Sequence, residues 1–284
     1  MGLPEGFTFS QSSLQDYVDC PRRFELRYVL QCAWPAPETA DALELEQAMR
    51  RGHAFHRLLR QFHAGLPAPS LTATAAGDPH LSRWWANYLA SPPQDLPDVL
   101  REPELTLSAP VYSYRVEARY DLLAAEPGAR WVIVDWKTGQ RRTPRPWLRR
   151  RLQTRIYPFL LVRAGATLNG GVPPPAEQVT MLYWFADFPL QPERFGYSPA
   201  QYSADEAYLD ALVKQITGQV RDGDAKGSPA LAKTEDLRQC RYCVYRSLCW
   251  DDVQAGTMAD RDDSEPAAPE LDDLDVDSIA PIPF

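Results

Sequence analysis

Two acidic residues and one lysine stand at the ends of predicted strands, where their spacing suits phosphate chemistry. Residues 131–134 form a short apolar run that predicts a buried strand ending in Asp135 and Lys137. Side chains two residues apart on a strand point to the same face, so this carboxylate and this ammonium would meet in one small volume. The same residues also suit a solvated turn, which Thr138 and Gly139 would continue.

A second carboxylate lies at the end of the preceding predicted strand. From Tyr112 to Asp121 the chain alternates between aromatic or small residues and polar ones, which predicts a half-polar strand with an acid at its tip. If the strands are neighbours, Asp121 and Asp135 converge on a hard cation such as Mg²⁺ or Mn²⁺. The metal would activate water while Lys137 stabilises developing negative charge. We therefore expect phosphodiester hydrolysis without a covalent intermediate.

The helix predicted after these strands carries polar and basic residues that suit nucleic acid. Gln153 and Tyr157 are four residues apart, so they face the same way and could contact one bound nucleotide and the active site together. The positive charge of the region is concentrated in Arg141, Arg142, Arg145, Arg149, Arg150, Arg151 and Arg155, with Trp147 among them. Arginine interleaved with an aromatic residue is typical of single-strand grooves, and the alternative is a solvated helix face.

Four of the five cysteines are expected to bind one metal centre. Cys240, Cys243 and Cys249 lie close together near the end of the chain, and Cys20 lies near its start. A disulfide scaffold is not expected in a chain of this length without a secretory signal. Four thiolates suit either tetrahedral zinc or an iron–sulfur cluster, which would tie the first helical segment to the carboxyl-terminal turn. Cys32 is expected to be a small buried hydrophobe.

Hydrophobic periodicity predicts a mixed α/β domain over residues 1–250, followed by a tail over 251–284. Helices are expected over 11–30, 41–63, 84–89, 146–163 and 204–220, and strands over 104–107, 112–123, 131–137 and 178–185. A proline-rich break is expected at 34–37, and loops are expected at 66–70 and 91–97.

Five separated segments resemble the PD-(D/E)XK nuclease superfamily. They are Ser13–Tyr17 with Cys20–Phe24, Gly52–His56, Arg119–Asp121, Val134–Gly139 and Gln153–Tyr157. The similarity is to its RecB-like branch, which includes the AddB nuclease domain and CRISPR-associated adaptation exonucleases. It extends from about residue 12 to residue 249 and implies a restriction-endonuclease-like core, a central mixed sheet flanked by helices, with a helical amino-terminal insertion.

The resemblance also implies roles for individual residues. His56, Asp121, Asp135 and the backbone carbonyl of Trp136 would hold the metal, and Lys137 would be the catalytic lysine. His53 is the alternative to His56, which stands beside an apolar helix face and could simply pack there. Asp135 stands where many members carry glutamate, so the choice between Mg²⁺ and Mn²⁺ stays open. The cysteine spacing is similar to that of AddB-type [4Fe-4S] domains and favours this cluster over structural Zn²⁺.

The function expected from these features is that of a metal-dependent DNA nuclease. The resemblance favours an exonuclease acting on single-stranded DNA ends in repair, recombination or defence. Two alternatives stay open: a catalytically silent DNA-binding or scaffold protein of a repair complex, and a nuclease directed at RNA. The sequence lacks a Walker A phosphate loop, so any unwinding would require another protein.

The acidic tail accounts for the negative net charge. Residues 251–284 contain nine Asp and two Glu against one Arg, whereas residues 1–250 contain 29 basic and 27 acidic residues. This composition predicts disorder. The ending Ile282-Pro283-Phe284 resembles the acidic terminus of bacterial single-stranded-DNA-binding protein, which suggests docking to a helicase or another repair protein. Nucleic-acid mimicry and solubility are the alternatives.

No segment is apolar enough for a membrane span, and a cytoplasmic location is expected.

Overall fold

The computed structural model describes residues 2–32, 40–139, 141–225, 231–241 and 243–249 of the 284-residue chain. The acidic tail, with Ile282, Pro283 and Phe284, lies outside the described residues, as does the expected break at 34–37.

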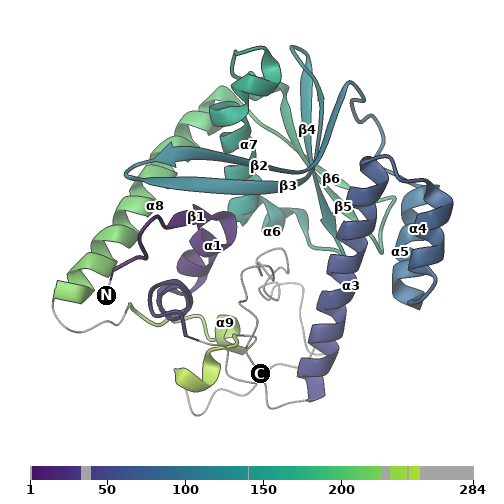
Figure 1. Ribbon diagram of the computed structural model, residues 1–284. Coiled ribbons are helices and arrows are strands. Elements are labelled where there is room, and N and C mark those ends of the chain that lie inside the picture. The colour runs from purple at the N-terminus through teal and green to yellow at the C-terminus, as the bar shows by residue number, and fades with distance from the viewer. Residues whose placement is uncertain (1, 33–39, 140, 226–230, 242, 250–284) are drawn as a thin grey trace.

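A mixed sheet forms the centre of the described part of the chain (Figure 1). Its strands are β1 (Thr8–Ser10), β2 (Leu100–Val111), β3 (Tyr114–Glu126), β4 (Arg130–Lys137), β5 (Val179–Phe185) and β6 (Glu193–Gly196). The order is β1-β3-β4-β5-β6, with β2 also paired to β3. The pairs β1–β3 and β4–β5 are parallel, and the pairs β2–β3, β3–β4 and β5–β6 are antiparallel. The expected mixed α/β architecture is therefore confirmed.

The helical segments surround this sheet. They are α1 (Gln11–Asp19), α2 (Pro21–Phe24), the π-helical turn η1 (Glu25–Val29), α3 (Ala40–His63), α4 (Ala68–Ala75), α5 (Pro79–Ala90), α6 (Arg145–Arg150), α7 (Leu152–Ala164), the 3₁₀ turns η2 (Gly165–Asn169) and η3 (Ala176–Gln178), α8 (Pro199–Ala225), α9 (Arg238–Arg241) and the 3₁₀ turn η4 (Arg246–Leu248).

Several helical boundaries differ from the sequence-based expectation, and α5 and α8 each begin five residues earlier than expected, at Pro79 and Pro199. The first helix ends at Asp19, because Pro21 occupies the first turn of α2 and cannot continue the hydrogen bonds of α1. The helix expected over 146–163 is divided at Arg151, whose backbone is extended. Residues 66–70 were expected to be a loop, but α4 begins at Ala68 after a proline.

Helices cover both faces of the sheet and create two hydrophobic cores. One core packs β-strand side chains such as Ile133 against α1, α7 and α8, and the other packs Val134 against α3, α4 and α5 (Figure 1). Side chains alternate along β4, so Trp136 lies in the second core. Asp135 and Lys137 consequently point to the face that α7 covers.

An aromatic cluster in the second core contains a histidine whose charged form is disfavoured. His63 Nε2 lies 2.8 Å from the hydroxyl of Tyr88, and the His63 ring stacks on Trp136 with 5.9 Å between centroids. Burial, together with the positive charge of Arg101, lowers the pKa of His63 to about 4. His63 is therefore neutral in the folded protein at neutral pH.

We expect this histidine to make the fold less stable in acid. Between pH 6.5 and 4 the unfolded chain binds a proton at His63 that the folded chain excludes, so the free energy of unfolding falls as the pH falls. The expected contribution is about 2 kcal/mol between pH 7 and pH 4.5. Urea denaturation of the wild type and His63→Gln at both pH values measures it. An equal loss in both proteins would show that His63 does not contribute.

None of the helices in the described ranges combines the length and apolarity that a membrane crossing needs.

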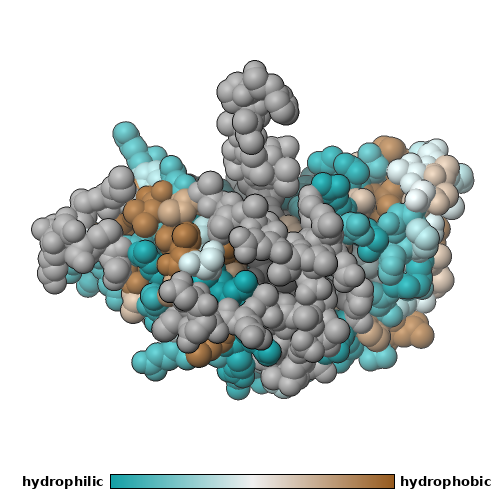
Figure 2. All heavy atoms as spheres, turned by 90° about the horizontal axis from the view of Figure 1, so that it is seen from below, coloured by the Kyte–Doolittle hydropathy of each residue, from teal (hydrophilic) through white to brown (hydrophobic). Residues whose placement is uncertain are grey.

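Seen from below the view of Figure 1, the surface of the described residues shows hydrophobic areas separated by hydrophilic ones (Figure 2).

Candidate active site

The candidate site lies where strands β3 and β4 separate. These strands pair from Glu126–Arg130 to Leu122–Val134, whereas β4 remains paired with β5 up to Lys137–Phe185. Asp121 and Asp135 are the next residues on β3 and β4 after the last pair. The separation of the strands therefore places both predicted carboxylates at one opening in the sheet.

The backbone of β3 is irregular at Asp121. Tyr120 and Leu122 would share a face in a regular strand, yet Tyr120 lies in the first core and Leu122 in the second. On the neighbouring strand β2, Glu104 has a φ of +57°, which few non-glycine residues adopt. Val116, Ala118 and Tyr120 all lie in the first core, as the expected alternation requires, and the alternation breaks between Tyr120 and Leu122, at Asp121.

Asp121 connects helix α3 to strand β4. Its Oδ1 lies 3.2 Å from Nδ1 of His56, and its Oδ2 accepts a hydrogen bond of 2.7 Å from the backbone N–H of Trp136. The side chains of His56 and Asp121 are 12% and 10% exposed. His56, the histidine that the resemblance implies as a metal ligand, thus contacts Asp121.

Asp135, Lys137 and Gln153 form a second group of mutual contacts. Lys137 Nζ lies 3.0 Å from Asp135 Oδ2 and donates a hydrogen bond of 3.1 Å to Gln153 Oε1. Gln153 Nε2 donates to Asp135 Oδ1. Asp135 is nearly fully buried, so its charge requires such partners. Gln153 thus holds the carboxylate and the ammonium in fixed positions.

Trp136 links the two groups through its backbone. Its N–H contacts Asp121, and the residues on either side of it belong to the second group. Because the N–H and C=O of one residue in an extended strand point to the same side, the Trp136 carbonyl also faces the opening. Carboxylates, a carbonyl and an imidazole are ligand types that Mg²⁺ or Mn²⁺ accepts.

The donor types therefore fit a divalent cation, but the side chains are not gathered around one point. Across the described residues, no three His, Cys, Asp or Glu side chains form a group that could hold a metal ion. Shared coordination by His56, Asp121 and Asp135 stays a prediction.

Tyr157 has a different place from its partner in the Gln-x-x-x-Tyr pair. Its side chain is buried, its ring centroid lies 5.1 Å from that of Tyr120, and its carbonyl accepts a hydrogen bond of 2.9 Å from the Tyr120 hydroxyl. Tyr157 therefore fixes α7 against β3, whereas Gln153 reaches the candidate catalytic residues.

The predicted basic segment divides into exposed and packed residues. Arg141, Arg145, Arg149 and Arg150 are exposed, and Arg142 and Arg155 are partly buried. Arg151 is buried, with its guanidinium 4.9 Å from the Trp147 ring centroid. Arg151 and Trp147 thus stabilise the junction of α6 and α7.

Tyr183 is a residue of this region that the sequence did not reveal. It pairs with Asp135 across the parallel strands β4 and β5, and its ring centroid lies 5.4 Å from Lys137 Nζ. The nearly continuous apolar run of β5 could have predicted its burial. Only the pairing of β5 with β4 places it beside the lysine.

The four cysteines predicted to act together line one small cavity between the two ends of the described chain. Cys20 precedes α2, whereas Cys240, Cys243 and Cys249 follow one another over α9 and η4. No disulfide joins any of the five cysteines, all of which are described. Burial raises the pKa of Cys243 to about 11. The donor set of four thiol groups fits a metal centre by its chemistry, but across the described residues no three of these side chains are gathered so that they could hold an ion.

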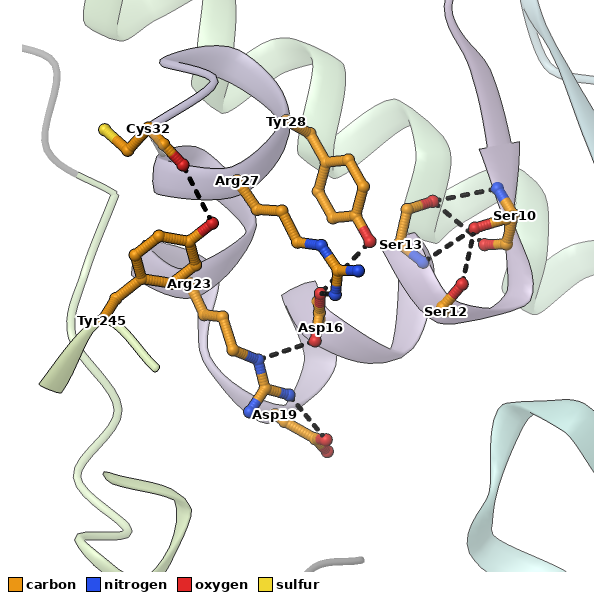
Figure 3. A network of polar contacts seen from close by, with 10 residues as sticks. All are labelled: Ser10, Ser12, Ser13, Asp16, Asp19, Arg23, Arg27, Tyr28, Cys32 and Tyr245. Atoms are coloured by element: carbon orange, nitrogen blue, oxygen red, sulfur yellow. Dashed lines mark hydrogen bonds and ion pairs between the residues drawn. The ribbon is translucent and has the colours of Figure 1, made fainter. Parts of the chain in front are cut away.

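A partly buried ion-pair network lies beside this cavity (Figure 3). The guanidinium of Arg23 lies 2.7 Å from Asp16 and 3.0 Å from Asp19. Burial disfavours the charge of Arg23, but Asp16 and Asp19 more than offset this effect and raise its pKa. A fixed positive charge therefore stands beside Cys20 and Cys243, where it would stabilise thiolates.

Cys32 lies outside the cavity lining and is only half-buried, so its expected full burial is wrong. Its carbonyl accepts a hydrogen bond of 3.2 Å from the hydroxyl of Tyr245.

No curated protein matches this chain. Among solved structures, SSO0001 is 15% identical with a TM-score of 0.42, and the match covers 90% of each chain. A "Putative exonuclease" from Eubacterium rectale is 9% identical with a TM-score of 0.43, over 81% of this chain and 91% of that one. The model of one family, the PD-(D/E)XK nuclease superfamily, matches residues 8–250. By this match over most of its length, the chain belongs to the PD-(D/E)XK nuclease superfamily.

Proposed function

We propose that the protein is a RecB-like, metal-dependent nuclease that degrades single-stranded DNA from its ends. The observation that carries the proposal is the contact set at the separation of β3 and β4, where Asp121 meets His56 and Asp135 meets Lys137. Membership of the superfamily supports a nucleic acid as the substrate. Degradation of single strands from an end goes beyond this membership and needs its own test.

In this proposal Asp121, Asp135, His56 and the Trp136 carbonyl would hold Mg²⁺ or Mn²⁺. The bound ion would lower the pKa of a water molecule and offset charge on the scissile phosphate. Lys137 would place a positive charge where negative charge develops, and Gln153 would keep the lysine in position through its hydrogen bond of 3.1 Å.

We further propose that Cys20, Cys240, Cys243 and Cys249 hold a [4Fe-4S] cluster that closes the nuclease domain. Their arrangement around one cavity, from opposite ends of the described chain, supports a shared centre. Such a centre would convert metal-binding free energy into folding free energy. Structural Zn²⁺ at the same four residues is the alternative.

Cleavage assays on four labelled substrates test the proposed activity. Linear single-stranded DNA, circular single-stranded DNA, duplex DNA and single-stranded RNA are incubated with Mg²⁺ or Mn²⁺, with and without EDTA. We expect metal-dependent cleavage of the linear single strand, and resistance of the circle because it has no end. Binding of DNA without cleavage under every condition would instead favour a scaffold protein. Preferential cleavage of RNA would show that the substrate is RNA rather than DNA.

Gln153→Leu is expected to slow cleavage about tenfold or more, because the amide that positions Asp135 and Lys137 is lost while the side chain keeps a similar size. Gln153→Glu should also impair activity, because its carboxylate cannot donate to Asp135. Initial rates at saturating substrate measure the effect, and thermal unfolding checks the fold. Wild-type rates in both variants would show that Gln153 has no role in positioning Asp135 and Lys137.

A further inference from the structure

A pocket of about 580 Å³ lies next to the candidate active site. Tyr183 connects the two places, because Lys137 Nζ lies 5.4 Å from its ring centroid and Thr154 of the pocket lies 2.7 Å from its hydroxyl. Phe195, which also lines the pocket, packs its ring edge-on against Tyr183 at 6.0 Å. A ligand in this pocket would therefore be separated from the lysine by one aromatic side chain.

The pocket presents more positive than negative charge. Arg145, Arg149 and Arg155 line it. Arg155 forms an ion pair of 2.6 Å with Asp205, and Glu193 is shared between Arg145 and Arg142. The lining itself thus holds three guanidinium groups and one carboxylate, and Arg142 and Glu193 lie outside it. This balance favours a ligand with a negative charge, such as a phosphate.

Planar groups provide surfaces on which a base could stack. The guanidinium of Arg145 lies 4.2 Å from the Phe195 ring centroid, and that of Arg155 lies 3.9 Å from the Tyr208 centroid. Bases stack on aromatic rings and on guanidinium groups in single-strand binding sites. The volume of the pocket is also within the range of small-ligand sites.

We propose that this pocket binds one unstacked nucleotide of a single-stranded substrate, next to the nucleotide whose phosphate is cleaved. Arg145 and Arg149 would contact its phosphate, and the stacked Arg145–Phe195 pair would contact its base. The inference rests on the proposed nuclease function and specifies a subsite for its substrate. Duplex DNA would not fill the site, because its bases are paired and stacked.

Filling the pocket with a large side chain tests the proposal. Ala204 lines the pocket from an exposed position of α8, so Ala204→Trp would occupy space without disturbing a core. Ala211→Trp, two turns along the same exposed face, is the matched control. Both are made in a Lys137→Ala background, and binding of a labelled oligothymidylate of about ten nucleotides is followed by fluorescence anisotropy. We expect Ala204→Trp to raise the Kd about tenfold or more and Ala211→Trp to leave it unchanged.

Charge reversal provides a second measurement. Arg149→Glu is compared with Arg150→Glu, which lies one residue along α6 and outside the pocket lining. A general electrostatic attraction predicts equal losses of affinity, whereas the pocket predicts a clearly larger loss for Arg149→Glu.

Thermal unfolding checks that all variants are folded. The proposed subsite is contradicted if Ala204→Trp and Ala211→Trp bind with equal affinity and Arg149→Glu and Arg150→Glu lose equal affinity. This conclusion would hold even if the wild type cleaves DNA. The predicted differences in binding would support the pocket even if the wild type cleaves nothing, so failure of the subsite and failure of the nuclease function are distinguishable.

Discussion

Lys137→Ala is expected to reduce the rate of DNA cleavage by about 10²–10³-fold while leaving the fold intact. The ammonium lies 3.0 Å from Asp135 and is held by Gln153, so its loss removes a fixed positive charge from the reaction site. The loss of rate should appear at saturating substrate, because the lysine acts on developing charge rather than on binding alone.

Lys214→Ala is the matched control, since Lys214 is an exposed residue of α8. It should cleave at the wild-type rate and unfold at the wild-type temperature, whereas Lys137→Ala should unfold at a lower temperature, because the buried Asp135 loses its ion-pair partner. Cleavage by Lys137→Ala at the rate of Lys214→Ala would remove the lysine from the catalytic role.

Cys243→Ser is expected to lower the free energy of unfolding by more than about 3 kcal/mol and to reduce the bound iron. The four cavity cysteines come from opposite ends of the described chain, so a metal centre there would hold those ends together. Purification without oxygen, iron and zinc analysis, visible absorbance and urea denaturation measure these effects. A brown wild-type protein is expected.

Cys32→Ser is the matched control for the cysteine experiment, because Cys32 lies outside the cavity lining. It should retain the metal content and stability of the wild type. A colourless wild-type protein that contains zinc would show that the four cysteines bind Zn²⁺ instead of an iron–sulfur cluster. Equal stability and equal metal content in Cys243→Ser and Cys32→Ser would contradict a shared centre.

Several long elements could be predicted from the sequence because their patterns are long, although only residues 104–107 of the 12-residue strand β2 were expected. The apolar run before Asp135, the alternation of β3 and the periodicity of α3 each extend over enough residues to distinguish a helix from a strand. Strands β1 and β6 have three and four residues, which is too short for an alternation to stand out. Their positions depend on pairing with β3 and β5.

The site could be predicted only in part, for a related reason. Spacing alone placed Asp135 and Lys137 on one face, and the structure has them in contact. The alternation of β3 predicted the shared face of Ala118 and Tyr120, but it could not predict the break between Tyr120 and Leu122, opposite a residue with positive φ on β2. The run of arginines looked uniform in the sequence, but Arg151, at the break between α6 and α7, is buried, whereas Arg149 and Arg150 are exposed.

The central claim is that Asp121 and Asp135 bind the same divalent cation. Titration calorimetry of Mn²⁺ into the wild type, Asp121→Asn and Asp135→Asn tests it directly, with Asp98→Asn, at an exposed loop position, as the control. We expect each of the two site variants to weaken the same binding event about tenfold or more, and the control to leave it unchanged. Wild-type affinity for Mn²⁺ in either site variant would contradict the shared cation.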